Sequence, residues 1–484
     1  MTLHVPTTKN FKQNVKEAMA NENVQEAMRA AGTGFVGKRA TARAAVPQFD
    51  DIRDDAKALK DHVLGHLDLY LERYETQVTD AGGHVHWAET AEDMQKIVLD
   101  ICRKAGAKTV NKGKTMISEE AGINAMLEEN GIKPVETDLG EYIIQLRDET
   151  PSHIIAPAIH VTVDEVKDLF RETHTHLPED RNLDDLEGML REARAVLRQK
   201  YFEAEVGITG ANMLIAETGQ SIIVTNEGNG DLSQSLPKVH IVLASLEKIV
   251  PTMEDAATVL RVLARSATGQ EMSVYTTLSS GPRRAEDPDG PEEYHVVLLD
   301  NGRTDMIGSE FQDMLRCIRC GACMNHCPVY QSVGGHAYGW VYPGPMGSVL
   351  TPGLIGVEEG GMLPNASTFC GRCEAVCPMR IPLPKMMRHW REEEFERNLT
   401  PSAARYGLGV WAFFAKRPGL YRAATRMAMG ALKLMAGKKR KMASLPLGKG
   451  WTDHRDFPAP EGGTFMAQWK AAQKKKAAQM GAQS

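Results

Sequence analysis

The stretch "CIRCGACMNHCPVY", residues 317–330, carries four cysteines in the spacing C-x2-C-x2-C-x3-C, and the last is followed by proline. A loop with this spacing holds three thiolates on one iron-sulfur cluster, while its fourth cysteine ligates a second cluster. Cys317, Cys320 and Cys323 are therefore predicted to share one cluster. Cys327 is predicted to serve the other.

A second stretch, "STFCGRCEAVCPMR", residues 367–380, repeats most of this pattern. If its last cysteine crosses over in the usual way, Cys377 is the fourth ligand of the first cluster and completes a [4Fe-4S] centre. The second cluster is then held by Cys327, Cys370 and Cys373. The spacing thus predicts two neighbouring clusters, both expected to be [4Fe-4S].

The second cluster lacks an eighth cysteine, because Ser367 stands three residues before Cys370, where a full motif has cysteine. Three outcomes stay open: a [3Fe-4S] centre, a [4Fe-4S] centre whose fourth iron takes Ser367, water or another group, and a cluster with an iron open to substrate. Zinc is disfavoured, since the 2-2-3 spacing ending in proline fits a tetrahedral site poorly. The remaining cysteine, Cys102, lies in an apolar helical stripe and is predicted to be a buried core residue.

Composition limits the class of protein. The chain has 484 residues, enough for two or three domains, and its net charge of −6 argues against a nucleic-acid partner. No secretory signal is seen at the N-terminus, and no apolar run approaches the ~18 residues of a spanning helix. We therefore expect a cytoplasmic protein, in which reduced thiols hold a metal centre rather than disulfides.

Helical and apolar stretches alternate over residues 61–305, which predicts an α/β domain with a mostly parallel sheet. One amphipathic helix is predicted over residues 54–83. Another is predicted between Thr90, as its cap, and Gly106, as its stop.

Three further regions flank this domain. Residues 1–60 are predicted to form helical segments that dock on the body or on a partner, with a poorly ordered arm as the alternative. Residues 306–395 are predicted to be an α-helical, ferredoxin-like domain with two clusters. Residues 396–484 form a basic, partly amphipathic tail, whose apolar part at 405–441 suits a partner's groove, a membrane surface or intramolecular packing.

The loop "TNEGNGD", residues 225–231, follows a predicted strand. Its backbone N–H groups at 228–230 could cradle a carboxylate or a phosphate. Alternatively, Asn229-Gly230 is a simple turn and Glu227 only hydrogen-bonds to it. Near the cysteines, His326 is expected at a solvent-facing helix edge, while Arg319 and Arg372 are expected either near the clusters or in solvent.

The chain resembles the lactate utilisation protein B family, iron-sulfur subunits of a three-component system that oxidises L-lactate. The stretches that carry the resemblance are 209–252, 317–330, 334–347, 363–383 and 454–469. The resemblance implies a cytoplasmic electron carrier that acts with two other subunits in oxidation of L-lactate to pyruvate. It also implies the same two ligand sets, an absent eighth cysteine, and an α/β fold similar to sugar-phosphate isomerases and coenzyme A transferases.

We therefore expect an electron-carrier subunit of an oxidoreductase complex, and we assign no catalytic residue. The partners expected are the other subunits of a lactate-oxidising complex, and the inner face of the membrane is the alternative contact for the tail. One alternative is the iron-sulfur subunit of a related glycolate or glycerol-phosphate oxidising system. Another is a catalytic α/β domain that acts on a small carboxylate or thioester near Glu227.

Overall fold

The computed structural model describes residues 5–445, 448–452 and 455–481. Two compact units make up the chain, residues 1–396 and residues 397–484. The first unit contains an α/β layer, the cysteine-bearing segment and the N-terminal helices. The second unit is mostly helical.

A six-stranded parallel sheet forms the centre of the α/β layer, in the order β1-β10-β7-β4-β2-β3. Its strands are β1 (His84–Ala88), β2 (Thr109–Lys112), β3 (Lys133–Glu136), β4 (Val206–Gly210), β7 (Val239–Ser245) and β10 (Glu293–Leu299). The chain adds β3 on one side of β2, and then adds β4, β7 and β10 in succession on the other side. The order therefore reverses between β2 and β4, where α/β sheets commonly bind ligands.

Alternate residues of the central strands enter two different cores. Ile241 and Leu243 of β7 pack with α5 (Ala91–Lys104), whereas Val242 and Ala244 pack with α4 (Leu67–Asp80) on the other face. Because both faces are covered, every residue of β7 is buried. The predicted α/β fold with a mostly parallel sheet is confirmed.

One of the two helices predicted with their ends, α5, begins and ends as expected. Thr90 caps α5 in a reciprocal capping box with Asp93, and Gly106 follows its end with φ +65°. The other helices of this layer are α6 (Met116–Glu120), α7 (Ile123–Glu129), α8 (Leu139–Leu146), α9 (Val163–Thr173), α10 (Leu186–Glu203), α11 (Asn229–Ser235) and α12 (Met253–Ala267).

Two local predictions were wrong. The single helix expected over residues 54–83 is two helices, α3 (Phe49–Leu64) and α4, because the chain turns at Gly65 and His66, where φ and ψ of His66 are −141° and 35°. The expected turn at Asn229-Gly230 is instead the start of α11, and Gly228 takes the left-handed conformation before it.

Four further strands of the α/β layer form a second sheet. Its order is β8-β5-β6-β9, with strands β5 (Met213–Ile215), β6 (Gln220–Thr225), β8 (Ile249–Val250) and β9 (Tyr275–Ser279). Met213, Ile215 and Ile222 of this sheet share one core with α12 and with the cysteine-bearing segment. The small sheet thus joins the α/β layer to the cysteines.

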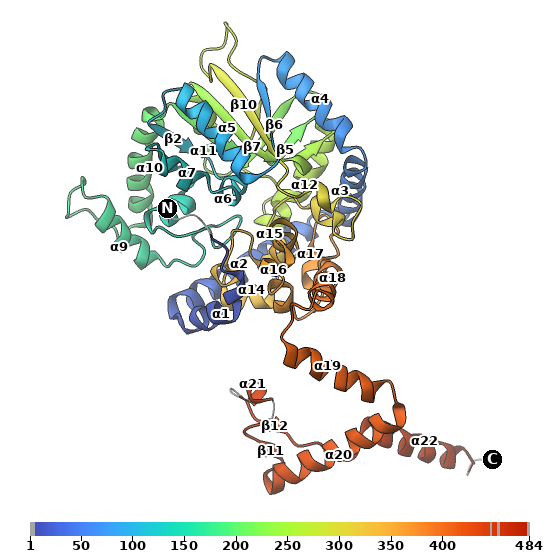
Figure 1. The fold of residues 1–484 in the computed structure, drawn as a ribbon. Coiled ribbons are helices and arrows are strands. Elements are labelled where there is room, and N and C mark those ends of the chain that lie inside the picture. Colours follow the sequence, from blue (N-terminus) through green and yellow to red (C-terminus); the bar gives the residue numbers. More distant parts are fainter. Residues whose placement is uncertain (1–4, 446–447, 453–454, 482–484) are drawn as a thin grey trace. The chain divides into compact units, whose positions relative to one another are not determined.

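The N-terminal helices α1 (Phe11–Ala20) and α2 (Glu22–Ala44) pack against the cysteine-bearing segment, although the two regions are far apart in the sequence. Figure 1 shows α1 and α2, in dark blue, beside α14. Phe11 and Tyr338 meet edge to face, with ring centroids 5.4 Å apart. The helices of the cysteine-bearing segment are short: α13 (Ala322–Asn325), α14 (Pro328–Val333), α15 (Gly344–Ile355), α16 (Val357–Gly360), α17 (Arg372–Val376) and α18 (Leu383–Glu396).

The second unit contains the helices α19 (Ser402–Ala415), α20 (Pro418–Ala436), α21 (Lys449–Thr452) and α22 (Phe465–Gly481), and a short ladder of β11 (Lys441–Met442) with β12 (Phe457–Pro458). Trp411, Phe413 and Leu434 are exposed on α19 and α20. Among the described residues, no helix combines the length and the apolar character needed to cross a membrane.

Candidate functional site

Seven cysteines surround two small cavities in the first unit. One cavity, here the first thiol cavity, is lined by Cys317, Cys320, Cys323 and Cys377. The other, the second thiol cavity, is lined by Cys327, Cys370 and Cys373 together with Ser367. The structure therefore brings together the same two sets of residues that the spacing predicts to share a cluster.

The two cysteine loops have the same backbone conformation at matching positions. Arg319 and Phe369, each just before a Cys-Gly pair, have φ of 57° and 53°. Gly321 and Gly371, just after those cysteines, have φ of 71° and 78°. Left-handed residues other than glycine are costly and are kept where a site demands them. The repeat curls each loop around its own cavity.

Ser367 stands at the position of the second loop that Cys317 occupies in the first. Each follows a 3-10 turn, and their φ and ψ are −70° and 133° for Ser367 and −66° and 120° for Cys317. The Ser367 hydroxyl accepts a hydrogen bond from the backbone N–H of Phe369 at 3.1 Å. The backbone at Ser367 thus matches that at Cys317.

Four of the seven cysteines, Cys320, Cys323, Cys373 and Cys377, are buried, whereas Cys317 and Cys327 are half-buried and Cys370 is exposed. Burial raises the pKa of Cys320 and of Cys373 to about 12, and nearby thiols add to the shift. The pKa of Cys323 is raised well above its ordinary value, first by burial and then by thiols that include Cys373 of the other cavity. Buried sulfur donors of this kind suit a metal cluster, which binds them as thiolates, so the residues present fit two iron-sulfur centres.

Arginines from the N-terminal helices donate hydrogen bonds to backbone carbonyls of the second cysteine loop. Arg53 of α3 donates to the carbonyl oxygens of Ala375 (3.0 Å) and Cys377 (2.6 Å). Arg39 of α2 donates to the carbonyl of Val376 at 2.8 Å. These bonds satisfy the carbonyls at the end of α17 and place positive charge behind Cys377.

A buried ion network joins the first cysteine loop to the α/β layer. Glu247 lies 3.0 Å from Arg319 and 3.3 Å from Arg303, and all three side chains are buried. Arg303 also forms a bidentate pair with Glu120, at 2.9 and 2.7 Å. Burial alone would raise the pKa of Glu247, but Arg303 and Arg319 outweigh it and lower that pKa to about 2. Of the two expected places for Arg319, the buried one beside the cysteines is confirmed.

A larger cavity of about 220 Å³ lies at the carboxyl ends of β2, β3, β4 and β7, and we call it the strand-end cavity. Its polar lining includes Lys114, Asp138, Glu227, Lys248 and Arg319. Arg319 lines the first thiol cavity as well. The strand-end cavity and the first cysteine loop are therefore immediate neighbours.

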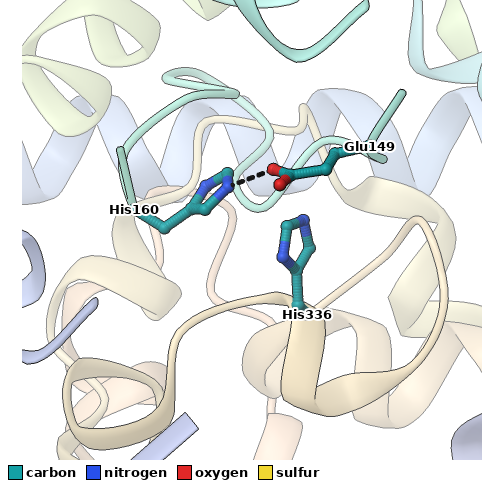
Figure 2. Close-up of side chains that lie close together, drawn as sticks. All are labelled: Glu149, His160 and His336. Atoms are coloured by element: carbon teal, nitrogen blue, oxygen red, sulfur yellow. Dashed lines mark hydrogen bonds and ion pairs between the residues drawn. The ribbon is translucent and has the colours of Figure 1, made fainter. Parts of the chain in front are cut away.

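Glu149, His160 and His336 meet where the loop after α8 reaches the cysteine-bearing segment, as Figure 2 shows. His160 Nε2 lies 2.8 Å from Glu149, and His336 Nε2 contacts the carbonyl of Thr150 at 2.7 Å. Their ligand atoms lie within 4.8 Å of one another, a spacing that suits a metal ion. Arg147 already pairs with Glu149 at 2.8 Å, however, so we assign this group a structural role in closing the loop.

Other predicted residues fall in several places. Cys102 is fully buried in the core beside the sheet, as predicted. His326 is half-buried rather than solvent-facing, with Nδ1 2.9 Å from the carbonyl of Ala322, whereas Arg372 is exposed. Sequence reasoning missed Glu247 and Lys248. The signal was a charged pair inside the run 239–250, in which the other residues, except His240 and Ser245, are apolar.

Three known families match successive parts of the chain. The LUD domain matches residues 71–299, the 4Fe-4S dicluster domain residues 313–381, and "Lactate utilisation protein B, C-terminal" residues 372–474. The comparison with solved structures includes the crystal structure of a duf162 family protein from Deinococcus radiodurans, which is 16% identical in sequence. The match covers 48% of this chain and 98% of that chain, with a TM-score of 0.27, which is too low to support a statement on the fold.

Whole-chain relatives agree with these matches. Lactate utilization protein B of Bacillus velezensis is 40% identical over 469 residues, covering 96% of this chain and 98% of that protein. The protein of the same name from Bacillus licheniformis is 40% identical over 473 residues, covering 97% and 98%. With its seven cysteines around two cavities and a 4Fe-4S dicluster match over the same residues, the chain is an iron-sulfur protein of the lactate utilisation protein B family.

Proposed function

We propose that the protein carries electrons between partner subunits during oxidation of L-lactate to pyruvate. The observation that supports this most directly is the pair of neighbouring thiol cavities, because α13, which carries Cys323 of one set, packs against α17, which carries Cys373 of the other. An iron-sulfur cluster takes up and releases single electrons, so two neighbouring clusters suit a carrier rather than a site of hydride chemistry.

The proposed ligands follow the two cavities. Cys317, Cys320, Cys323 and Cys377 would hold the first [4Fe-4S] cluster. Cys327, Cys370 and Cys373 would hold the second, also [4Fe-4S], and the backbone match with Cys317 supports Ser367 as its fourth ligand. The chain's own contribution is to bury four of the seven thiols, to fix the first loop through the Arg319–Glu247 pair, and to fix the second through Arg39 and Arg53.

The proposed setting is the cytoplasm, where thiols stay reduced, with the other subunits of a lactate-oxidising system as partners. The exposed apolar side chains of α19 and α20 support a docking role for the second unit, on a partner subunit or at the inner face of the membrane. A related 2-hydroxy acid such as glycolate is the alternative substrate of the system.

Anaerobic mixing tests the proposed function. The purified holoprotein, its partner subunits and L-lactate should together bleach the visible iron-sulfur absorption, and D-lactate or omission of the partners should not. Unchanged absorption with active partner subunits would contradict an electron-carrier role. Faster bleaching by glycolate than by L-lactate would indicate that glycolate is the substrate of the system.

Replacement of Ser367 tests the second ligand set. Ser367→Cys should supply a fourth thiolate and keep the iron content, because the backbone already matches that of a cysteine ligand. Ser367→Ala should lose about one iron and show the oxidised-state EPR signal of a three-iron centre. Iron quantitation and low-temperature EPR on anaerobically purified protein report both, and Thr368→Ala, beside it in the same cavity lining, is the matched control. An alanine variant with unchanged iron and EPR would show that Ser367 is not a ligand.

A further inference from the structure

We propose that the strand-end cavity binds a small monocarboxylate of the 2-hydroxy or 2-oxo acid class. The cavity lies where the strand order reverses, outside the carboxyl ends of β2, β3, β4 and β7, the usual ligand position in an open α/β sheet. The choice of a carboxylate rests on the cavity's own side chains. Only the choice of this class of acid rests on the proposed function.

Three polar groups of the cavity have no partner among the described residues. Lys248, which is 8% exposed, makes no hydrogen bond or ion pair with a described residue, although the charge of Glu247 nearby favours its ammonium form. Asn229 Nδ2 and Thr225 Oγ1 are also buried without a partner, and Asn229 is only 4% exposed. Buried donors are normally satisfied, so this arrangement calls for a ligand with acceptor oxygens.

The acidic side chains of the lining do not accept hydrogen bonds from these donors, because they accept from backbone N–H groups instead. Glu227, at the rim, accepts from the backbone N–H of Leu139 at 3.3 Å. Asp138 caps α8 by accepting from the N–H groups of residues 140 and 141 at 3.0 and 3.2 Å. Lys114 donates to the carbonyl of Ile155, which does not neutralise its charge. Two carboxylates therefore balance the ammonium groups of Lys114 and Lys248, and it is the unpaired donors, rather than an excess of positive charge, that favour a ligand with acceptor oxygens.

The rest of the lining is apolar and limits the kind of anion. Side chains from α12, from the loop after α8 and from the two sheets form this wall, and they include Ile154, Ile155, Ile223, Leu243, Leu263 and Ala267. A short hydrocarbon group fits such a wall, whereas free phosphate would leave it without an apolar partner. The combination of donors and apolar wall suits a compact organic acid.

Arg319 couples this cavity to the first thiol cavity, because it lines both. An anion bound beside Arg319 would oppose the addition of negative charge to a cluster held by Cys317, Cys320 and Cys323. Reduction of that cluster would weaken binding of the acid by the same factor, since coupling between two equilibria is reciprocal. Bound acid should therefore make the first cluster harder to reduce.

Calorimetric titration of the oxidised holoprotein under argon tests the site, with L-lactate, pyruvate, acetate and inorganic phosphate as probes. L-Lactate or pyruvate should bind more tightly than acetate and phosphate. Lys248→Met should weaken that binding by about tenfold or more, because it removes a charge-assisted hydrogen bond. The exposed Lys238→Met is the matched control and should bind as the wild type does.

A redox titration followed by EPR gives a readout independent of turnover. Saturating L-lactate or pyruvate should lower the midpoint potential of one cluster in the wild type and leave it unchanged in Lys248→Met. Absence of binding, equal affinity for all four anions, or full affinity in a folded Lys248→Met would each overturn the proposal. Bleaching by lactate with the partner subunits would still stand in that case, so failure of this site and failure of the electron-carrier role can be told apart.

Discussion

Cys377→Ala is expected to remove the same cluster as Cys317→Ala, although 60 residues of sequence separate the two positions. Cys377 belongs to the second motif by sequence but lines the first thiol cavity with Cys317, Cys320 and Cys323. Loss of one thiolate leaves this cluster with three, so the variant should lose at least one iron and the EPR signal of the first cluster should be replaced or disappear. Iron quantitation and EPR of the reduced protein measure this directly.

The EPR signals of different cysteine-to-alanine variants decide which cysteines share a cluster. Cys373→Ala should match Cys327→Ala in its remaining EPR signal and should differ from Cys377→Ala, because those two residues line the second thiol cavity. Cys102→Ala, a buried cysteine of α5 outside both cavities, should keep all its iron. If Cys377→Ala and Cys373→Ala left the same signal, each motif would hold its own cluster and the crossed assignment would be wrong.

Glu247→Gln is expected to destabilise the first unit strongly. The change leaves Arg319 without its buried counter-ion and removes one of the two carboxylates beside Arg303. Breaking a buried ion pair from one side costs about 3–5 kcal/mol, which in a unit of this size should lower Tm by about 5 °C or more. Anaerobic thermal unfolding at a fixed scan rate is the measurement.

The pH range of this effect follows from the pKa of Glu247, which falls from its ordinary 4.5 to about 2 in the folded protein. The folded state holds the ionised form more tightly, so the stabilisation is fully present above about pH 5 and is lost as pH falls toward 2. The difference between wild type and variant should therefore stay constant through the neutral range. Glu254→Gln, an exposed glutamate of α12, is the control, and equal Tm values for wild type and Glu247→Gln would show that the network contributes no stability.

Much of the fold and of the candidate centre can be predicted from the sequence, because their signals are local. The cysteine spacing depends on a few consecutive residues, and the two loops indeed repeat left-handed positions such as Gly321 and Gly371. The apolar run of β7 and the Thr90 cap are likewise read within one segment. The two cysteine groups could be anticipated because each motif follows one loop geometry.

The strand-end cavity could not be predicted, because its residues meet only through the topology of the sheets. Lys114, Lys248 and Arg319 are distant in sequence and converge only when β2 and β7 end at one edge and the first cysteine loop packs there. The break at Gly65 was missed for a different reason. Amphipathic periodicity continues across it, and the packing of α3 and α4 on separate surfaces decides the turn.

The arginine contacts behind the second cysteine loop also limit the order in which the chain can assemble during translation. Arg53 lies 324 residues before Cys377, so its final contact cannot form until more than three quarters of the protein has left the peptidyl-transferase centre. At about 5–20 residues per second, that wait is on the order of half a minute. The α/β layer, with its own two cores, has time to fold in the interval. Insertion of the proposed first cluster, which needs Cys377 as well as Cys317, is therefore expected to follow folding of the α/β layer.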